Sequence, residues 1–221
     1  PEEITPGVPN WYASTYYDGE DYASVLVKTR EGRPIHITGN PRFGINRDPK
    51  IDKGTINARV NSSVLSLYDS ERLPGPMLVK DGGFTQHAWA DVDKAIGDEL
   101  AAASAAGKRI VLLSNTVISP SVKAAISVFT AKHGLKLNSG DKDVSVQVGG
   151  NVDHVQYDTI SYAGLTNANL RTFGKRAFPA YDLTKADVVV GIGADFLSNW
   201  GSGTEYTWQY ADRRRPETAT K

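Results

Sequence analysis

The residues best placed to do chemistry are Gly191 and Gly193, which follow an apolar run at residues 186–192. A glycine-rich turn after a strand is where the phosphates of a dinucleotide bind, because the backbone approaches them closely there. The third glycine of that pattern would fall at Phe196, whose ring blocks close helix–strand packing. The pattern therefore favours a turn that needs positive φ at a glycine. Asp195 could face a ligand crevice, although a capping or turn role is favoured.

The candidate metal ligands are the four histidines of the chain, His36, His87, His133 and His154. No two of them are spaced to share one helix face, and no His-Glu-x-x-His motif occurs. A metal site would need four separate segments to converge. The sequence instead favours histidines on a strand surface, in loops and at a helix end.

Other catalytic motifs are missing from the sequence. It has no Gly-x-Ser-x-Gly nucleophile elbow and no phosphate-binding loop of the Walker type. The basic run Arg213, Arg214 and Arg215 could contact phosphate or an acidic partner, but a solvated helix end matched to the helix dipole is favoured.

Composition excludes several classes of protein. The 221 residues carry 25 lysines and arginines against 25 aspartates and glutamates, so no overall charge attracts nucleic acid or an anionic membrane. No apolar run is long enough to span a bilayer. The absence of cysteine excludes disulfides, thiol catalysis and cysteine-ligated clusters, but it does not fix the compartment. The chain begins at Pro1 without a signal-like segment, so we expect a processed protein or part of a longer one.

The first part of the chain has the turn chemistry of β-hairpins. Residues 1–21 predict an extended lead-in whose aromatic side chains pack on a neighbour. The following elements are predicted in chain order: a hairpin with strands at 22–30 and 35–38, a mobile loop at 43–53, a short helix at 61–68 and a second hairpin at 77–85.

From about residue 88 the pattern changes to helices alternating with apolar strands. Helices are predicted at 90–106, 121–133, 167–174 and 204–214, strands at 109–114, 154–157 and 186–192, and a surface loop or hairpin at 138–151. Fully apolar strands alternating with helices favour a parallel sheet covered on both faces. We therefore expect an α/β fold, with a β-rich segment at 1–87 and a parallel-sheet unit at 88–221.

The order of several short motifs resembles the first part of molybdopterin oxidoreductase catalytic subunits. These motifs lie at residues 32–41, 54–57, 67–76, 83–84, 89–96 and 185–195. Within that family, residues 1–15 and 54–69 are most similar to the large iron–sulfur subunit of bacterial alternative complex III, a membrane-bound quinol-oxidising assembly.

That resemblance implies a molybdopterin-oxidoreductase-like domain that has lost its own cofactor. Iron–sulfur clusters would lie in a later part of the same subunit and c-type haem in partner subunits. The other partners would be integral membrane subunits that bind quinol, and the location would be the periplasmic face of the bacterial inner membrane. No contact with nucleic acid and no membrane span are expected.

Two positions carry the resemblance to a redox site. Asn57 stands where the family has its last cluster cysteine, and Arg59 lies near the basic residue between cluster and pterin. An amide oxygen is a poor replacement for a thiolate on iron, so Arg59 is expected to make structural hydrogen bonds instead. We therefore expect no catalytic, cofactor-binding or metal-ligating residue in this chain.

The function expected is thus structural, within a respiratory quinol oxidoreductase. One alternative is a fragment of a true molybdopterin enzyme that keeps pterin without an N-terminal cluster. Another is a module that binds a small molecule at the Gly191 turn. The three differ in what the protein should retain: neither molybdenum nor pterin, bound pterin, or a ligand at that turn.

Overall fold

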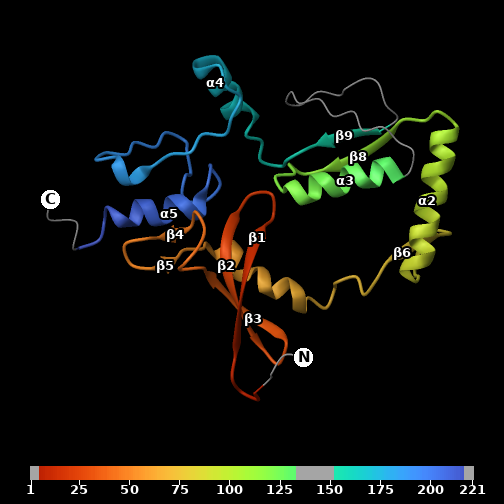
Figure 1. Ribbon diagram of the computed structural model, residues 1–221, viewed down its shortest axis with the longest axis horizontal. Coiled ribbons are helices and arrows are strands. Elements are labelled where there is room, and N and C mark those ends of the chain that lie inside the picture. The colour runs from red at the N-terminus through yellow and green to blue at the C-terminus, as the bar shows by residue number, and fades with distance from the viewer. Residues whose placement is uncertain (1–4, 133–151, 217–221) are drawn as a thin grey trace. The chain divides into compact units, whose positions relative to one another are not determined.

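The chain folds as a mixed α/β protein, shown in Figure 1 as a computed structural model that describes residues 5–132 and 152–216. Contacts divide it into two compact units, one formed by Pro1–Arg72 with Tyr162–Lys221 and the other by Leu73–Ser161. The mixed α/β class is confirmed, whereas the molybdopterin-oxidoreductase-like fold and a domain boundary near residue 88 stay predictions. No helix in the described ranges has the length and hydropathy needed to cross a membrane.

The first unit is built on a five-stranded antiparallel sheet with the strand order β1-β2-β3-β5-β4. Its strands are β1 (Asn10–Tyr17), β2 (Tyr22–Arg30), β3 (Arg33–Gly39), β4 (Arg47–Asp48) and β5 (Lys53–Gly54). The hairpin formed by β2 and β3 confirms the prediction. The extended lead-in is confirmed too, since β1 pairs with β2 along its whole length.

The aromatic residues of the lead-in are mostly exposed, contrary to the prediction that they pack on a neighbour. Trp11 is 47% exposed and Tyr12 43% exposed, while Tyr16 packs against the core. Because β1 is an edge strand, side chains on either face of it have a neighbouring strand on one side only.

The core of this unit lies between the sheet and the short helix that follows it. Its buried members come from β2, β3, α1 (Ala58–Ser62) and the 3-10 helix η1 (Ser63–Tyr68), and they are Ala23, Val25, Ile37, Val60 and Val64. The alternation of Ala23, Val25 and Val27 puts one face of β2 on this core. The helix predicted at 61–68 therefore exists, but it begins earlier and its second half is 3-10.

The loop predicted at residues 43–53 is mostly turn, as expected, but it also contains β4 and the first residue of β5 and is organised around a buried asparagine. Asn46 is fully buried, and its carboxamide oxygen accepts from the Ser24 backbone N–H at 2.9 Å. Its amide group donates to the carbonyls of Ser24 and Thr55 at 3.0 and 2.8 Å. The Asn46 side chain makes the hydrogen bonds to backbone groups that a neighbouring strand would otherwise make. Its polarity is nevertheless typical of a loop in the local sequence pattern.

The same sheet requires glycine where β3 meets β5. Gly39 pairs with Gly54, and a Cβ on Gly39 would lie 2.3 Å from the Gly54 carbonyl carbon. A Cβ on Gly54 would meet Gly39 at 2.2 Å. The two backbones approach so closely at this pair that neither position has room for a side chain, which explains why both residues are glycine.

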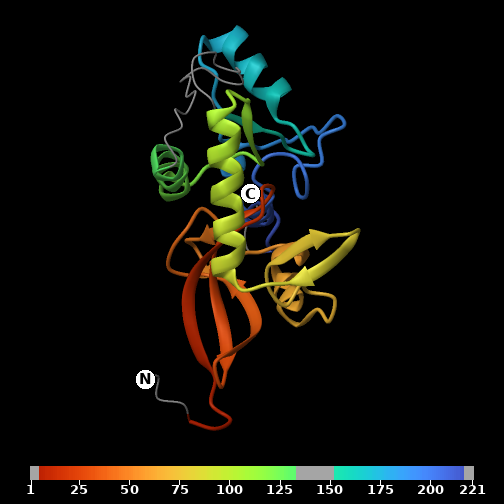
Figure 2. The ribbon, with the colours of Figure 1, turned by 90° about the vertical axis from the view of Figure 1, so that its right-hand side faces the viewer.

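The second unit contains a hairpin and a small parallel sheet with helices. The hairpin of β6 (Met77–Lys80) and β7 (Gly83–Gln86) confirms the prediction and is visible as the yellow ribbon in Figure 2. Its turn has positive φ at Asp81 and Gly82, as a tight hairpin needs.

The helices of this unit are α2 (Trp89–Ala105) and α3 (Pro120–Lys132), close to their predicted positions. Strands β8 (Ile110–Ser114) and β9 (Val152–Gln156) pair in parallel, with Ile110 opposite Val152. The predicted parallel sheet is thus present with two strands in the described residues. The predicted loop or hairpin at 138–151 and the end of the second helix lie outside them.

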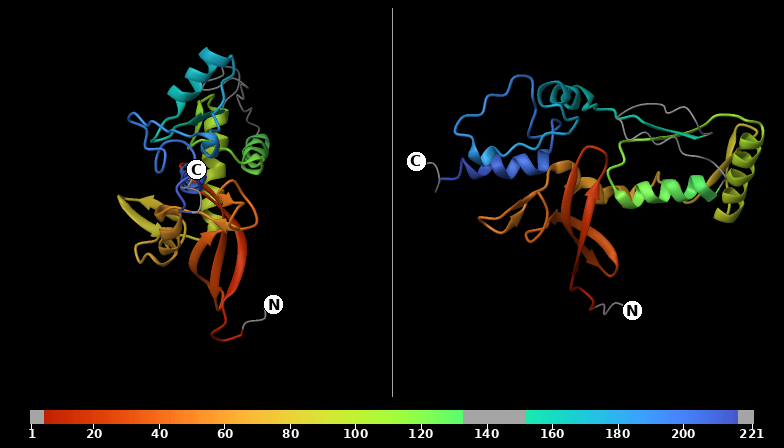
Figure 3. Two further views of the ribbon diagram at one scale, coloured as in Figure 1. Left: turned by 90° about the vertical axis from the view of Figure 1, so that its left-hand side faces the viewer. Right: turned by 45° about the horizontal axis from the view of Figure 1, so that its top comes forward.

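The later part of the first unit consists of α4 (Ala163–Phe173), the 3-10 helix η2 (Leu183–Lys185) and α5 (Gly203–Asp212). Helix α4 ends at Gly174 in the left-handed conformation, with φ of 68°. The strand predicted at 186–192 is wrong: Figure 3 shows the blue stretch between η2 and α5 as irregular coil, and no described strand pairs with it. An apolar sequence becomes a strand only with a partner to bond.

Candidate functional site

The position expected to correspond to a cluster ligand is instead the cap of a helix. Asn57 precedes α1 with extended backbone, and its carboxamide oxygen accepts from the Val60 backbone N–H at 2.9 Å. Its amide group donates to Oδ1 of Asp21 at 2.8 Å. An asparagine at this place satisfies one of the open N–H groups at the start of α1.

Asp21 is the centre of the site, with a side chain only 2% exposed. Its second oxygen, Oδ2, accepts from Nε of Arg59 at 2.5 Å. The guanidinium of Arg59 also pairs with Glu20 at 2.7 Å and reaches Asn199 at 3.4 Å. The hydrogen bond to Asp21 is the largest cause that raises the pKa of Arg59. The Asp21 carboxylate therefore joins the start of β2 to α1, and Arg59 extends the network to the Asn199 loop of the same unit.

A tight turn before β2 holds this carboxylate in place. Oδ1 of Asp18 accepts from the backbone N–H groups of Glu20 and Asp21 at 2.9 and 2.7 Å. Its Oδ2 accepts from the Tyr16 hydroxyl at 2.9 Å. Burial acts to raise the pKa of Asp18, but these hydrogen bonds outweigh it and lower that pKa. Burial first, and then the Asp18 carboxylate, raise the pKa of Tyr16 to about 12.

These contacts do not fit an iron–sulfur cluster at Asn57. Both ends of its carboxamide are engaged by Val60 and Asp21, and the whole sequence has no cysteine to supply a thiolate. The guanidinium of Arg59 faces two carboxylates of its own chain. The prediction that Arg59 makes structural hydrogen bonds is confirmed.

Sequence reasoning missed Asp21, which is the member that joins the others. The available signal was the acidic run at Asp18, Glu20 and Asp21 directly before an apolar strand. A carboxylate beside a buried strand needs a cation, and Arg59 is the cation it meets.

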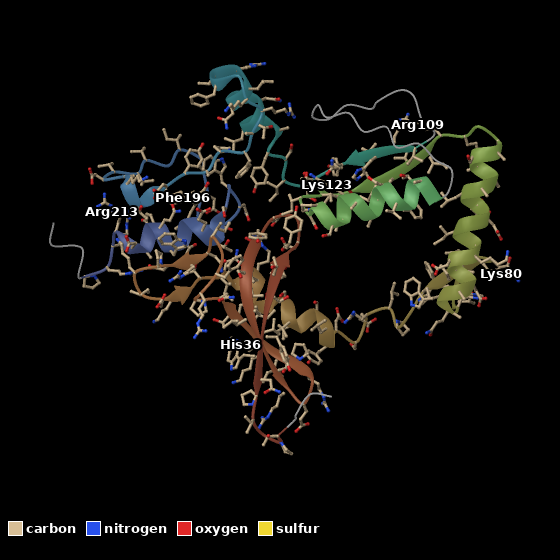
Figure 4. All side chains as sticks on the ribbon, viewed as in Figure 1. His36, Lys80, Arg109, Lys123, Phe196 and Arg213 are labelled. Atoms are coloured by element: carbon tan, nitrogen blue, oxygen red, sulfur yellow. The ribbon has the colours of Figure 1, made fainter. Side chains whose placement is uncertain are left out.

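Of the glycine turn predicted at residues 191–193, the positive φ is found at Gly193, but the strand expected before it is not formed. Gly193 has φ of 64°, which a glycine adopts readily. Asp195 lies in a turn where its carbonyl accepts from Ser198 and Trp200 at 3.1 and 3.0 Å. Phe196, labelled in Figure 4, packs on the Tyr210 ring of α5 with 5.5 Å between centroids.

The structure places the described histidines in separate environments. His36 is exposed on β3, as Figure 4 shows, and the His87 ring lies 3.1 Å from the Thr85 hydroxyl. Nε2 of His154 lies 2.8 Å from the Ser114 hydroxyl, across the parallel pair β8–β9. His133 lies outside the described residues. Within ranges 5–132 and 152–216, no three His, Asp or Glu residues gather in a way that could hold a metal ion.

A second buried polar cluster corrects the view of the arginine run as a solvated helix end. Asp48 and Asp212 each have side chains only 1% exposed, and Arg215 pairs with both. Lys50 adds a contact to Asp212 at 2.5 Å. Arg213 does form an exposed pair with Asp187 at 2.8 Å, so only part of the run is solvated.

The outer face of the sheet carries a shallow groove of about 440 Å³. Its lining residues are Trp11, Leu26, Thr38, Gly39, Pro41, Asp52, Lys53 and Gly54. Asp52 is already paired with Arg47 at 2.7 Å, so that carboxylate is not left to bind a cation. The groove lacks the converging polar groups that mark a small-molecule site.

Comparison with known proteins gives a distant likeness. No family model matches the chain. It is similar to the menaquinone reductase, molybdopterin-binding-like subunit of Nitratidesulfovibrio vulgaris, with 24% identity over 182 residues. The match covers 80% of this chain and 22% of the relative, so the chain spans about a fifth of that protein's length. The likeness supports a molybdopterin-oxidoreductase-like relationship and nothing narrower.

Proposed function

We propose that this chain is a structural, molybdopterin-oxidoreductase-like region of a subunit in a membrane-bound respiratory quinol or quinone oxidoreductase. It carries no redox cofactor of its own. Its role is to hold a rigid surface on which redox-active parts of the assembly are positioned. The narrower assignment that we propose is the large subunit of alternative complex III, on the periplasmic face of the inner membrane.

The observation that carries the proposal is the engagement of Asn57. Where a cluster ligand is expected, its carboxamide caps α1 and binds a buried carboxylate of the same chain. The adjoining guanidinium of Arg59 is neutralised by Asp21 and Glu20. A site whose polar groups are satisfied within the protein stabilises the fold, and it leaves no group aimed at a ligand.

The likeness to a molybdopterin-binding-like subunit supports the wider assignment. That relative is named as part of a menaquinone reductase, which makes quinone chemistry the natural setting for the complex proposed here. The electron-carrying groups of such a complex, iron–sulfur clusters and c-type haem, would then lie outside these 221 residues.

Molybdenum and pterin assays on the purified native complex test the proposal. We expect less than about a tenth of an atom of molybdenum per complex, and no fluorescent pterin after oxidative release, since no cofactor is held. Stoichiometric pterin or molybdenum would instead support the alternative, a molybdopterin enzyme without an N-terminal cluster. A molybdopterin enzyme carried through the same procedure controls for recovery of both analytes.

A further inference from the structure

The first unit is assembled from two stretches of the chain that lie far apart in sequence. Its N-terminal part, residues 5–72, carries the five-stranded sheet and α1, and its C-terminal part, residues 162–216, carries α4 and α5. Residues 73–161 between them form the second unit. Figure 1 shows α5 next to β4, and these two elements are in contact. The two parts therefore meet through side-chain and backbone contacts rather than through a direct chain connection.

The first half of α5 is bound to three separate segments of the N-terminal part. Thr204 is 1% exposed, and its hydroxyl donates to the Tyr22 carbonyl at 2.8 Å. The Thr204 carbonyl accepts from the Thr55 hydroxyl at 2.9 Å. One turn later, the indole N–H of Trp208 donates to the Ile45 carbonyl at 2.8 Å. These bonds fix the position of α5 on the sheet.

The end of α5 is held by buried ion pairs. Arg215 pairs with Asp48 of β4 as well as with Asp212 of its own helix. Lys50 of the N-terminal part reaches Asp212 at 2.5 Å. Because both carboxylates are only 1% exposed, salt screens these attractions less than it screens surface pairs. Both ends of α5 thus bind the N-terminal part.

The C-terminal part also has contacts of its own that hold α5 in shape. Tyr206 is 1% exposed and packs edge-on against Tyr181, with 6.1 Å between the ring centroids. The side-chain oxygen of Gln209 accepts from the Leu183 backbone N–H at 2.8 Å. A partner whose shape is organised before binding loses less entropy when it binds.

We propose that the N-terminal part is a binding surface for α5 that holds the C-terminal part without any chain connection. The second unit is then an insertion that the first unit does not need in order to stay assembled. A continuous chain adds an effective concentration on the order of millimolar to such contacts, so cutting the chain separates the two contributions. The inference concerns this chain alone and does not rest on the proposed function.

Cleavage of the folded chain tests the proposal. A protease recognition sequence is inserted in each connection, after Gly75 and after Thr159, where neither helix nor strand is formed. After both cuts, gel filtration and native mass spectrometry identify the fragments that stay together. We expect a binary complex of the first and last fragments to persist at about 10 µM. Release of the last fragment, or a complex that always contains the middle fragment, overturns the proposal.

Circular dichroism of the uncut protein checks that the insertions leave the fold intact. If they do not, insertions after Leu73 and after Ile160, in the same two connections, replace them.

Two neighbouring arginines give a matched comparison. Arg215 pairs with Asp48 across the two parts, whereas the guanidinium of Arg214 lies over the Tyr210 ring of its own helix, 3.5 Å from the ring centroid. Dilution of the cut complex measures the dissociation constant. Arg215→Ala should raise it by about tenfold or more, and Arg214→Ala by less than about threefold. Equal constants for the two variants would contradict the proposal, because the fragments would then associate through other surfaces.

Discussion

Asn57 donates a hydrogen bond to Asp21 at 2.8 Å, and Asp21 is the buried acceptor that also takes Nε of Arg59. The amide thus serves two structural purposes at once: it begins α1 and it helps to satisfy a carboxylate that is 2% exposed. Coordination of a metal through the Asn57 carboxamide oxygen would compete with the cap of α1. The relationship explains how contacts within the chain hold the site together.

Removal of the cap should weaken the fold measurably. Asn57→Ala deletes the bond to Val60 and one of the bonds to buried Asp21, so we expect a loss of about 1–3 kcal/mol in unfolding free energy. Urea denaturation followed by circular dichroism measures it. Asn57→Ser, which can still cap α1, should lose less; equal losses for the two variants would contradict the assigned roles.

Arg213 and Arg215 should differ strongly in how much they contribute to the stability of the fold. Arg215 is 19% exposed and pairs with two carboxylates that are 1% exposed, so Arg215→Ala should cost about 3 kcal/mol by leaving buried charge uncompensated. Arg213 pairs with Asp187, which is 91% exposed, and Arg213→Ala should stay within about 0.5 kcal/mol. Thermal and chemical unfolding of both variants decide it, and similar costs for the two would disprove the buried cluster.

Replacing Gly39 by alanine and replacing Gly97 by alanine should change the unfolding free energy in opposite directions. At Gly39 the new Cβ would lie 2.3 Å from backbone of Gly54, so β3 and β5 must separate at a cost of about 2–4 kcal/mol. At Gly97 in α2 nothing lies within 4 Å, and Gly97→Ala should stabilise by about 0.5–1 kcal/mol. Differential scanning calorimetry gives both signs, and a neutral Gly39→Ala would show that the strands do not cross so closely.

Alkaline pH should weaken the fold through Tyr16. Its pKa is raised from 10.0 to about 12, by burial first and then by the bond to the Asp18 carboxylate. Below pH 10 both states keep the proton, so nothing is lost. Between pH 10 and about 12 the unfolded chain gains by ionising while the folded chain does not, so stability falls, on the order of 2 kcal/mol.

The control for this pH dependence is Tyr16→Phe, which has no proton to lose. The variant should start less stable, since it lacks the bond to Asp18, but should lose less stability between pH 9 and 11. Chemical denaturation at the two pH values measures the difference. Parallel losses in both proteins would assign the alkaline effect to other tyrosines.

The sequence predicted elements whose apolar pattern and turns were local. Strand β2, the hairpin at Asp81 and the helix ending at Gly174 were all found where the pattern placed them. Their signals come from neighbours in the chain, namely alternation, turn residues and a glycine stop.

The errors concern segments whose structure depends on distant partners. The polarity, Pro49 and mixed charges of residues 43–53 predict a mobile loop, yet Asn46 binds Ser24 and Thr55, and Asp48 binds Arg215. Residues 186–192 were read as a strand from composition, although no described strand pairs with them. Long-range bonding of this kind leaves no mark in a local pattern.

Only some of the site residues could be predicted from the sequence. Asn57 and Arg59 were singled out from a family resemblance, but their partner Asp21 lies more than thirty positions earlier, as do Asp18 and Glu20. A single sequence does not show which of its 25 acids meets which of its 25 bases.

The most direct test of the central claim is electron transfer in the quinol oxidoreductase complex proposed above, assembled with Asn57→Ala. If the Asn57 site is structural, quinol oxidation per assembled complex should stay within about twofold of the unaltered protein, and the electron paramagnetic resonance signals of its clusters should be unchanged. A loss of one cluster signal, or a fall of roughly a hundredfold in turnover at equal assembly, would show that this site takes part in the redox chemistry.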